Sequence, residues 1–138
     1  MFRVTKEIHF CYGHRLLNYK GKCRFLHGHN AKVEIDLSSK ALDRRGMVID
    51  FNDVKRTVQG WIDTALDHKM LLNKRDPLIP HLKSIREPIV LIGQNPTAEA
   101  LARMIFDYAK NRRFPVTEVR FWETPTSFAT YRQIRARI

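Results

Sequence analysis

Several kinds of sequence feature are missing from this chain. It has no apolar run of about 18 residues, so no segment is expected to span a membrane as a helix. Met1 leads directly into an alternating pattern, without the apolar region of a signal peptide. The two cysteines, Cys11 and Cys23, are too few for a disulfide framework, and no low-complexity tract appears. Together with a length of 138 residues, these absences predict one cytoplasmic domain over residues 1–138.

Acidic residues are scarce as well. The chain has 14 aspartates and glutamates against 25 lysines and arginines, which gives a formal net charge of +11. A basic domain can bind nucleic acid, but the same field attracts a small polyanion such as a triphosphate. The basic residues are scattered and no aromatic residues cluster among them, which weighs against a nucleic-acid surface. A nucleic-acid binder would show an affinity that falls steeply with salt.

Two segments of alternating polarity dominate the N-terminal third. In residues 2–14 the apolar side chains share one parity, which ends on His14, and in residues 27–37 they share the parity of His27 and His29. Each pattern is typical of a half-buried strand, and the residues between them are expected to form a loop. An antiparallel hairpin then places His14 opposite His27 and His29, with all three on the apolar face.

Three histidines with an open fourth position are typical of a catalytic zinc site. Neutral imidazole suits zinc best among the common metals, although iron and copper also accept it. The alternative is that these histidines are ordinary strand or loop residues. The shared parity of His14, His27 and His29 favours the metal site, and we therefore predict Zn²⁺ as the cofactor.

A helix and a long irregular segment are predicted for the middle of the chain. Asp50 or Asn52 is expected to cap the helix, after a short extended piece at 46–49, and the helix is expected to end near residues 67–68. Residues 67–94 carry three prolines and are predicted to form an irregular functional loop.

A short strand at 89–92, a second helix beginning at Asn95-Pro96 and a hairpin pairing 116–123 with 127–137 complete the predicted elements. The order is ββααββ, an α+β domain with a four-stranded antiparallel sheet and both helices on one face. So small a sheet leaves exposed edges, which predict pairing with other chains and a homo-oligomer.

Cys23 is the first candidate for catalysis. It lies between Lys22 and Arg24 and near the predicted metal ion, and positive surroundings favour the thiolate. The alternative is a small buried apolar residue, which free cysteines usually are. Cys11 is the weaker candidate because it lies on the parity opposite the metal ligands.

Three further residues could carry chemistry. In Asp67-His68 the carboxylate can hold the tautomer of the imidazole and keep it basic, although a helix C-terminus also favours histidine through its dipole. Glu123 follows a strand whose inner positions are apolar, and its carboxylate could accept two hydrogen bonds from the edge of a guanine or pterin ring. The alternative for Glu123 is a solvent-exposed strand end.

Taken together, these residues resemble the 6-pyruvoyl-tetrahydropterin synthase / 6-carboxy-tetrahydropterin synthase family over nearly the whole chain. The motifs stand in the family's order: Phe10 to Leu16, Cys23 to Asn30, Gly46 to Phe51, Leu66 to His68, Asn95 to Glu99, and Glu123-Thr124. One position departs from the family's pattern. The family's first motif commonly reads Phe-x-Ala-Ala-His, whereas this chain has Tyr12 in place of a small residue, and we expect it to reshape the pocket beside the metal.

The resemblance implies a tunnelling fold, in which ββααββ subunits join three at a time into a twelve-stranded barrel and two barrels stack into a hexamer. The active site would lie at a subunit interface. The implied site residues are the zinc ligands His14, His27 and His29, the base Cys23, the proton-relay pair Asp67 and His68 of a neighbouring subunit, and the pterin anchor Glu123.

The implied activity is that of a zinc-dependent lyase that turns 7,8-dihydroneopterin triphosphate into 6-carboxy-5,6,7,8-tetrahydropterin for queuosine synthesis. The alternative product is 6-pyruvoyl-tetrahydropterin. Two functions of a different kind stay open: a basic zinc-containing nucleic-acid-binding module, and a catalytically idle family member with an oligomeric or regulatory role. Cys23→Ala would remove turnover from the enzyme but would not affect a binding module. We expect no nucleic-acid and no membrane partner.

Overall fold

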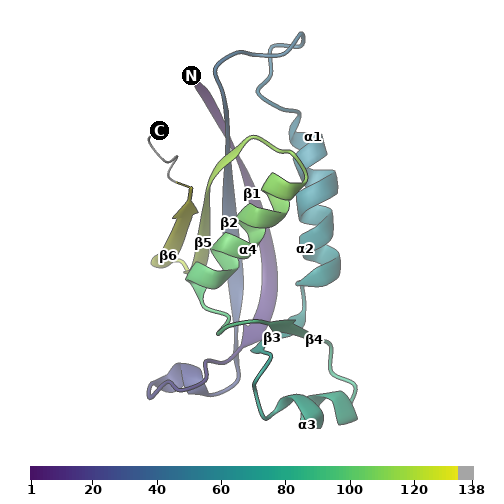
Figure 1. Cartoon of the computed structure of the whole chain (residues 1–138), viewed down its shortest axis with the longest axis vertical. Coiled ribbons are helices and arrows are strands. Elements are labelled where there is room, and N and C mark those ends of the chain that lie inside the picture. Colours follow the sequence, from purple (N-terminus) through teal and green to yellow (C-terminus); the bar gives the residue numbers. More distant parts are fainter. Residues whose placement is uncertain (134–138) are drawn as a thin grey trace.

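One mixed sheet of six strands organises the fold (Figure 1). The computed structural model describes residues 1–133, and all structural statements refer to these residues. The strands lie in the order β4-β3-β1-β2-β5-β6. Their bounds are β1 Phe2–His14, β2 His27–Ser39, β3 Lys69–Asn73, β4 Ile89–Ile92, β5 Val116–Thr124 and β6 Ser127–Arg132.

The predicted N-terminal hairpin is confirmed. β1 and β2 pair antiparallel along their whole length, with Tyr12 opposite His29 and His14 opposite His27. One face of β1 is buried from Ile8 to His14 at every second residue, as the alternation predicts. A short 3₁₀ turn, η1 (Lys22–Arg24), lies in the loop between the two strands.

The prediction of a four-stranded sheet is wrong, because residues 67–94 are not one irregular loop and contribute two further strands. β3 pairs parallel with the end of β1 at Tyr12 to His14, and β4 pairs parallel with β3. The consecutive residues Leu71 and Leu72 are both fully buried, so β3 lacks the alternation that identifies a half-buried strand. The strand at 89–92 is confirmed as β4, and α3 (Ile79–Ser84) connects it to β3.

The first predicted helix is a continuous helical segment of three parts, α1 (Phe51–Val54), the π-helical turn η2 (Lys55–Gln59) and α2 (Gly60–Ala65). Asp50 caps it, because its side chain accepts a hydrogen bond from the backbone N–H of Asn52. The extended piece expected at 46–49 is wrong. These residues form bends, and Gly46 has a φ of +82°, a conformation that suits glycine.

The second helix, α4 (Ala98–Asn111), begins two residues later than predicted. Its cap is Thr97, whose hydroxyl accepts a hydrogen bond from the N–H of Ala100, and Asn95-Pro96 precede the helix. The apolar residues of both helical segments share one core with the sheet, so both lie on one face of it, as predicted (Figure 1). No helix within residues 1–133 is long and apolar enough to cross a membrane.

The C-terminal hairpin is confirmed where the structure describes it. β5 and β6 pair antiparallel, and β6 ends at Arg132. Residues 134–137 of the predicted strand 127–137 lie outside the described residues.

The opposite face of the sheet carries an ion network centred on Asp36. This residue is fully buried. Arg120 donates two hydrogen bonds to this carboxylate, at 2.7 and 2.8 Å, and the Thr5 hydroxyl donates a third at 2.7 Å. Burial acts to raise the pKa of Asp36, but Arg120 and Thr5 outweigh it and hold the pKa below its usual value.

Replacing Asp36→Asn is expected to lower the free energy of unfolding by about 2 kcal/mol, because it removes the buried carboxylate that accepts two hydrogen bonds from Arg120, while Glu34 and Glu118 still pair with this arginine. A carboxyl with a depressed pKa stabilises the fold above the unfolded pKa, and the contribution is lost as the pH falls through the folded pKa. The difference from wild type, measured by urea unfolding, should be full above about pH 5 and shrink below about pH 4. Asp53→Asn, which removes an exposed carboxylate, is the control, and equal stability of the two variants would contradict this role for Asp36.

Candidate metal centre and active site

Three imidazoles meet where the first hairpin reaches its loop. The β1–β2 register brings His14 opposite His27, and the side chain of His29 points to the same face two residues later. Their ring centroids are 4.5 to 5.1 Å apart, and Nε2 of His14 lies 2.9 Å from Nε2 of His27. The predicted convergence of the three side chains is therefore present.

Backbone carbonyls fix the tautomers of two of these rings. Nδ1 of His14 donates to the carbonyl of Pro96 at 2.7 Å, and Nδ1 of His27 donates to the carbonyl of Phe25 at 2.8 Å. A carbonyl oxygen only accepts, so both Nδ1 atoms carry the proton when the rings are neutral, and both Nε2 atoms present lone pairs. Two lone pairs that face each other repel unless a cation lies between them. This donor set fits a metal ion, and the carbonyls give the outer support that metal-binding histidines usually have.

Glu123 is a fourth member of the cluster. Its Oε1 lies 2.8 Å from Nε2 of His29 and 3.5 Å from Nε2 of His14. The His29 nitrogen is buried and has no hydrogen-bond partner among the described residues, because it and the carboxylate are not aligned for such a bond. Together the four side chains offer ligand atoms that all lie within 4.8 Å of one another, a group that could hold a metal ion.

The electrostatics of the cluster suit a cation. The His14 imidazole beside it, together with the other two rings, holds the pKa of Glu123 below its usual value in spite of burial. Burial lowers the pKa of His29, which favours the neutral ring that binds metal. The site therefore combines neutral nitrogen donors with one ionised carboxylate.

Cys23 lies on the turn η1, at the same cavity as the metal group. This cavity of about 460 Å³ is also lined by His14, His29 and Glu123, and by residues at the start of α4. This cavity therefore joins the predicted thiol and the predicted substrate anchor to two of the three predicted ligands, and the third, His27, contacts His14. Cys11 and Cys23 are both free and partly exposed.

Asp67 and His68 lie elsewhere. Oδ2 of Asp67 accepts from Nδ1 of His68 at 2.7 Å, and Oδ1 accepts from the backbone N–H of Cys11 at 2.9 Å. Burial acts to raise the pKa of Asp67, but the Cys11 N–H and the His68 ring hold it below its usual value. The pair described in the sequence is therefore formed, with the carboxylate orienting the ring.

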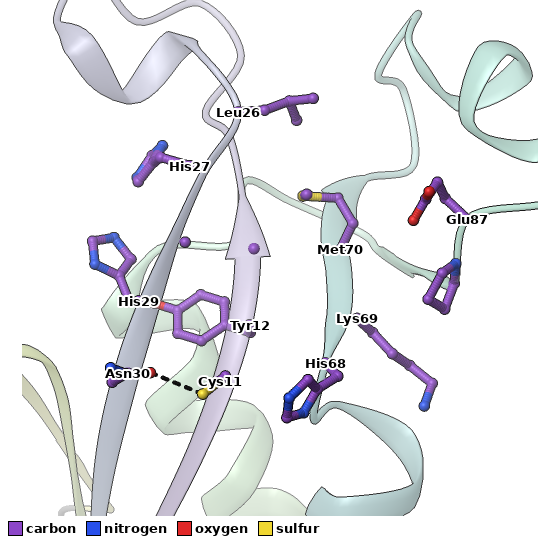
Figure 2. A pocket seen from close by; sticks show the side chains of 13 residues that line it. Cys11, Tyr12, Leu26, His27, His29, Asn30, His68, Lys69, Met70 and Glu87 are labelled. Carbon is purple, nitrogen blue, oxygen red and sulfur yellow. Dashed lines mark hydrogen bonds between the residues drawn. The ribbon is translucent and has the colours of Figure 1, made fainter. Parts of the chain in front are cut away.

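His68 lines a second pocket, to which Cys23 does not contribute. Figure 2 shows this pocket with His68 and Met70 on one side and the imidazoles of His27 and His29 on the other, so two of the clustered histidines border it as well. The His68 side chain is 79% exposed. Its backbone has a φ of +59°, in the left-handed region that few residues other than glycine adopt. One chain does not bring Asp67 and His68 to the cavity that holds Cys23.

Two features of the metal group were not predicted. The carbonyls of Pro96 and Phe25 leave no signal in a side-chain pattern. Parity could have placed Glu123 on the inward face of β5, because it follows the buried residues Val119 and Phe121 at every second position, but not beside the imidazoles.

Tyr12 contributes a third unpredicted feature, a buried hydroxyl group beside the cluster. Its ring centroid lies 5.1 Å from that of His14 and 5.7 Å from that of His29. Burial raises the pKa of Tyr12 far above its usual value, so the hydroxyl keeps its proton.

A sequence model described as 6-pyruvoyl tetrahydropterin synthase matches residues 3–134. The chain belongs to this family. The 6-carboxy-5,6,7,8-tetrahydropterin synthase of Rickettsia bellii is 34% identical over 139 residues, which cover 93% of this chain and 98% of the relative. The enzyme of the same name from Haemophilus influenzae is 35% identical over 141 residues, covering 96% and 100%.

Solved structures show the same fold. An uncharacterized protein from Wolinella succinogenes superposes with a TM-score of 0.79 at 27% identity, covering 96% of this chain and 98% of its own. The 6-pyruvoyl tetrahydropterin synthase of Caenorhabditis elegans superposes with a TM-score of 0.72 at 21% identity, covering 96% of each chain. The α+β architecture is therefore that of the 6-pyruvoyl tetrahydropterin synthase family.

His27→Ala and His29→Ala should each weaken zinc binding by more than about 100-fold. Loss of a residue that only hydrogen-bonds to a metal ligand already lowers metal affinity by about 10–100-fold, so loss of a ligand itself should lower it further. Competition with a chromophoric chelator measures the affinity. His81→Ala, which removes an exposed histidine on α3, is the control and should bind zinc like wild type. Unchanged zinc affinity in both variants of the cluster would rule out the ligand assignment.

Proposed function

We propose that this protein is a zinc-dependent lyase that converts 7,8-dihydroneopterin triphosphate to 6-carboxy-5,6,7,8-tetrahydropterin. The observation that carries the proposal is the single cavity shared by the imidazole group and the Cys23 thiol. Relatives that bear this enzyme's name, at 34% and 35% identity over nearly their whole length, support the choice of reaction. We further assign the protein to the cytoplasm and to queuosine synthesis.

His14, His27 and His29 would hold the zinc ion, which would supply a Lewis acid for the oxygens of the substrate side chain. The Cys23 thiolate takes a proton from a carbon of that side chain. Its position between Lys22 and Arg24 favours the thiolate. One water is consumed, and triphosphate and a two-carbon aldehyde leave. The side-chain carbon that stays on the pterin is oxidised to a carboxylate, and the C6=N5 double bond of the ring takes up the two electrons, which gives the tetrahydropterin.

Glu123 orients the pterin in this proposal. An ionised carboxylate can accept two N–H donors from the edge of the pterin ring. Its place beside His14 and His29 sets the ring close to the ion, so the side chain of the substrate reaches the ligands and Cys23 together. Before substrate binds, the same carboxylate can complete the group around the ion.

Asp67 and His68 serve a neighbouring copy of the chain. Neither residue lines the cavity that holds Cys23, and the exposed His68 ring is free to reach a substrate held by another subunit. Asp67 holds the His68 ring with Nδ1 protonated, so Nε2 is the nitrogen that exchanges a proton with that substrate.

The sheet offers the edges that such an assembly needs. β6 is an edge strand, and β1 has no strand partner on its second side before Tyr12 within the described residues. The antiparallel strands β1, β2, β5 and β6 of three copies would close a twelve-stranded barrel through these edges. We propose a trimer or a dimer of trimers, in which β3 and β4 lie outside the barrel.

Mass spectrometry of the product made from 7,8-dihydroneopterin triphosphate tests the reaction. We expect 6-carboxy-5,6,7,8-tetrahydropterin from wild type, and no turnover from Cys23→Ala with zinc still bound. Cys11→Ala, which removes the other thiol, should retain turnover. A product with the mass of 6-pyruvoyl-tetrahydropterin would support the alternative that the family's description names, and full activity of Cys23→Ala would exclude the proposed base.

Mixing two inactive variants tests the shared site. If Cys23 of one copy works with His68 of the next, Cys23→Ala and His68→Ala chains that are unfolded and refolded together should regain about one quarter of wild-type activity, since one site in four then has both residues. Each variant refolded alone is the control. No recovery in a mixture shown to contain mixed oligomers would place the whole site within one chain.

A further inference from the structure

Tyr12 lies within the metal group although it is not a metal ligand. Its side chain lies on the inward face of β1, two residues before His14. In the β1–β2 pair it stands directly opposite His29. Figure 2 shows its ring beside His29, and the centroids are 5.7 Å apart. The residue is 3% exposed, so its hydroxyl cannot reach solvent.

Packing explains the ring of Tyr12 but not its hydroxyl group. Phe10 and Phe121 hold the ring, with centroids 5.5 and 5.7 Å away, and a phenylalanine at position 12 would fill the same space. Among the described residues, the Tyr12 hydroxyl and Nε2 of His29 are the two buried side-chain polar atoms without a hydrogen-bond partner. A buried unpaired hydroxyl destabilises a fold, so its presence calls for an acceptor that becomes available in another state of the site.

Glu123 is the acceptor that the chemistry favours. Once the Nε2 atoms bind a metal ion, their lone pairs no longer accept hydrogen bonds, whereas a carboxylate has more acceptor sites than one ion uses. Glu123 and Tyr12 also contact the same two rings: Oε1 of Glu123 lies 2.8 Å from Nε2 of His29 and 3.5 Å from Nε2 of His14, and the Tyr12 ring packs against both imidazoles. Cys23 lines the same cavity as Glu123 and is the other anionic candidate. Of these two groups, Glu123 belongs to the metal group itself.

We propose that Tyr12 is a positioning residue of the metal centre, whose hydroxyl donates a hydrogen bond to the Glu123 carboxylate when the imidazoles hold a metal ion. The proposal rests on the metal centre of the proposed function. The hydrogen bond fixes the direction of the carboxylate. Glu123 then stays beside the ion and remains aligned for the pterin that binds there. A small residue at position 12, which the family commonly has, cannot supply this donor.

The test compares Tyr12→Phe with wild type, using Zn²⁺ and Co²⁺ as probes. Tyr12→Phe should bind Zn²⁺ about 10-fold more weakly in chelator competition, as expected when an outer partner of a metal site is lost. The visible bands of bound Co²⁺ should also shift. Without metal, its melting temperature should equal or exceed that of wild type, because only an unpaired hydroxyl is removed. Tyr108→Phe, which removes a hydroxyl from a ring stacked on Trp61, is the matched control and should change none of these values.

A double-mutant cycle assigns the partner. In a Glu123→Ala background, Tyr12→Phe should change Zn²⁺ affinity no further, and additive losses would overturn the role of Glu123. Two results would overturn the proposal without contradicting the proposed function. One is equal Zn²⁺ affinity and equal Co²⁺ spectra for Tyr12→Phe and wild type, and the other is a Tyr12→Phe protein that is less stable than wild type without metal. Absence of Zn²⁺ binding by wild type would instead overturn the metal centre itself.

Discussion

The pairing of β1 with β2 positions the three imidazoles of the site. It sets His14 opposite His27 and places His29 two residues along the same face, and a shift of one residue would turn one strand's imidazoles to the other side of the sheet. The register is secure because the same alternation buries Ile8, Phe10, Val33 and Ile35 in the core. The free energy that holds the core therefore also holds the ligands, and the backbone carbonyls of Pro96 and Phe25 then orient two of the rings.

Two pockets divide the chemistry. Cys23 lines one of them with His14, His29 and Glu123, whereas His68 lines the other together with His27 and His29. Under the proposed function, this division would make an isolated chain an incomplete catalyst. Assembly through the exposed sheet edges would then bring the base of one copy to the proton relay of the next.

Local patterns in the sequence predicted the hairpin, the shared parity of the three histidines and the Asp50 cap, because each depends on neighbours along the chain or on strict alternation. They did not predict β3, since its adjacent buried leucines Leu71 and Leu72 show no alternation. The start of α4 was placed at Asn95-Pro96 because proline often opens a helix, whereas the hydroxyl of Thr97 provides the cap.

The site was predicted to a similar extent. Residues on one hairpin could be placed relative to one another, so the imidazole group was accessible from the sequence. Glu123 comes from β5 and meets the histidines only through the β2–β5 pairing, which short-range patterns do not determine. Asp67-His68 was assigned to the site through the family resemblance, because its local pattern fits a helix C-terminus equally well. Its separation from the cavity of Cys23 depends on how β3 pairs with β1, which the sequence pattern did not predict.

The central claim is that one metal ion is held by Nε2 of His14, His27 and His29. An anomalous difference map from crystals of the zinc-loaded protein, collected on both sides of the zinc absorption edge, tests it directly. The account predicts one strong peak in contact with all three Nε2 atoms, present above the edge and weak below it. No peak between the three rings in zinc-loaded crystals would contradict it.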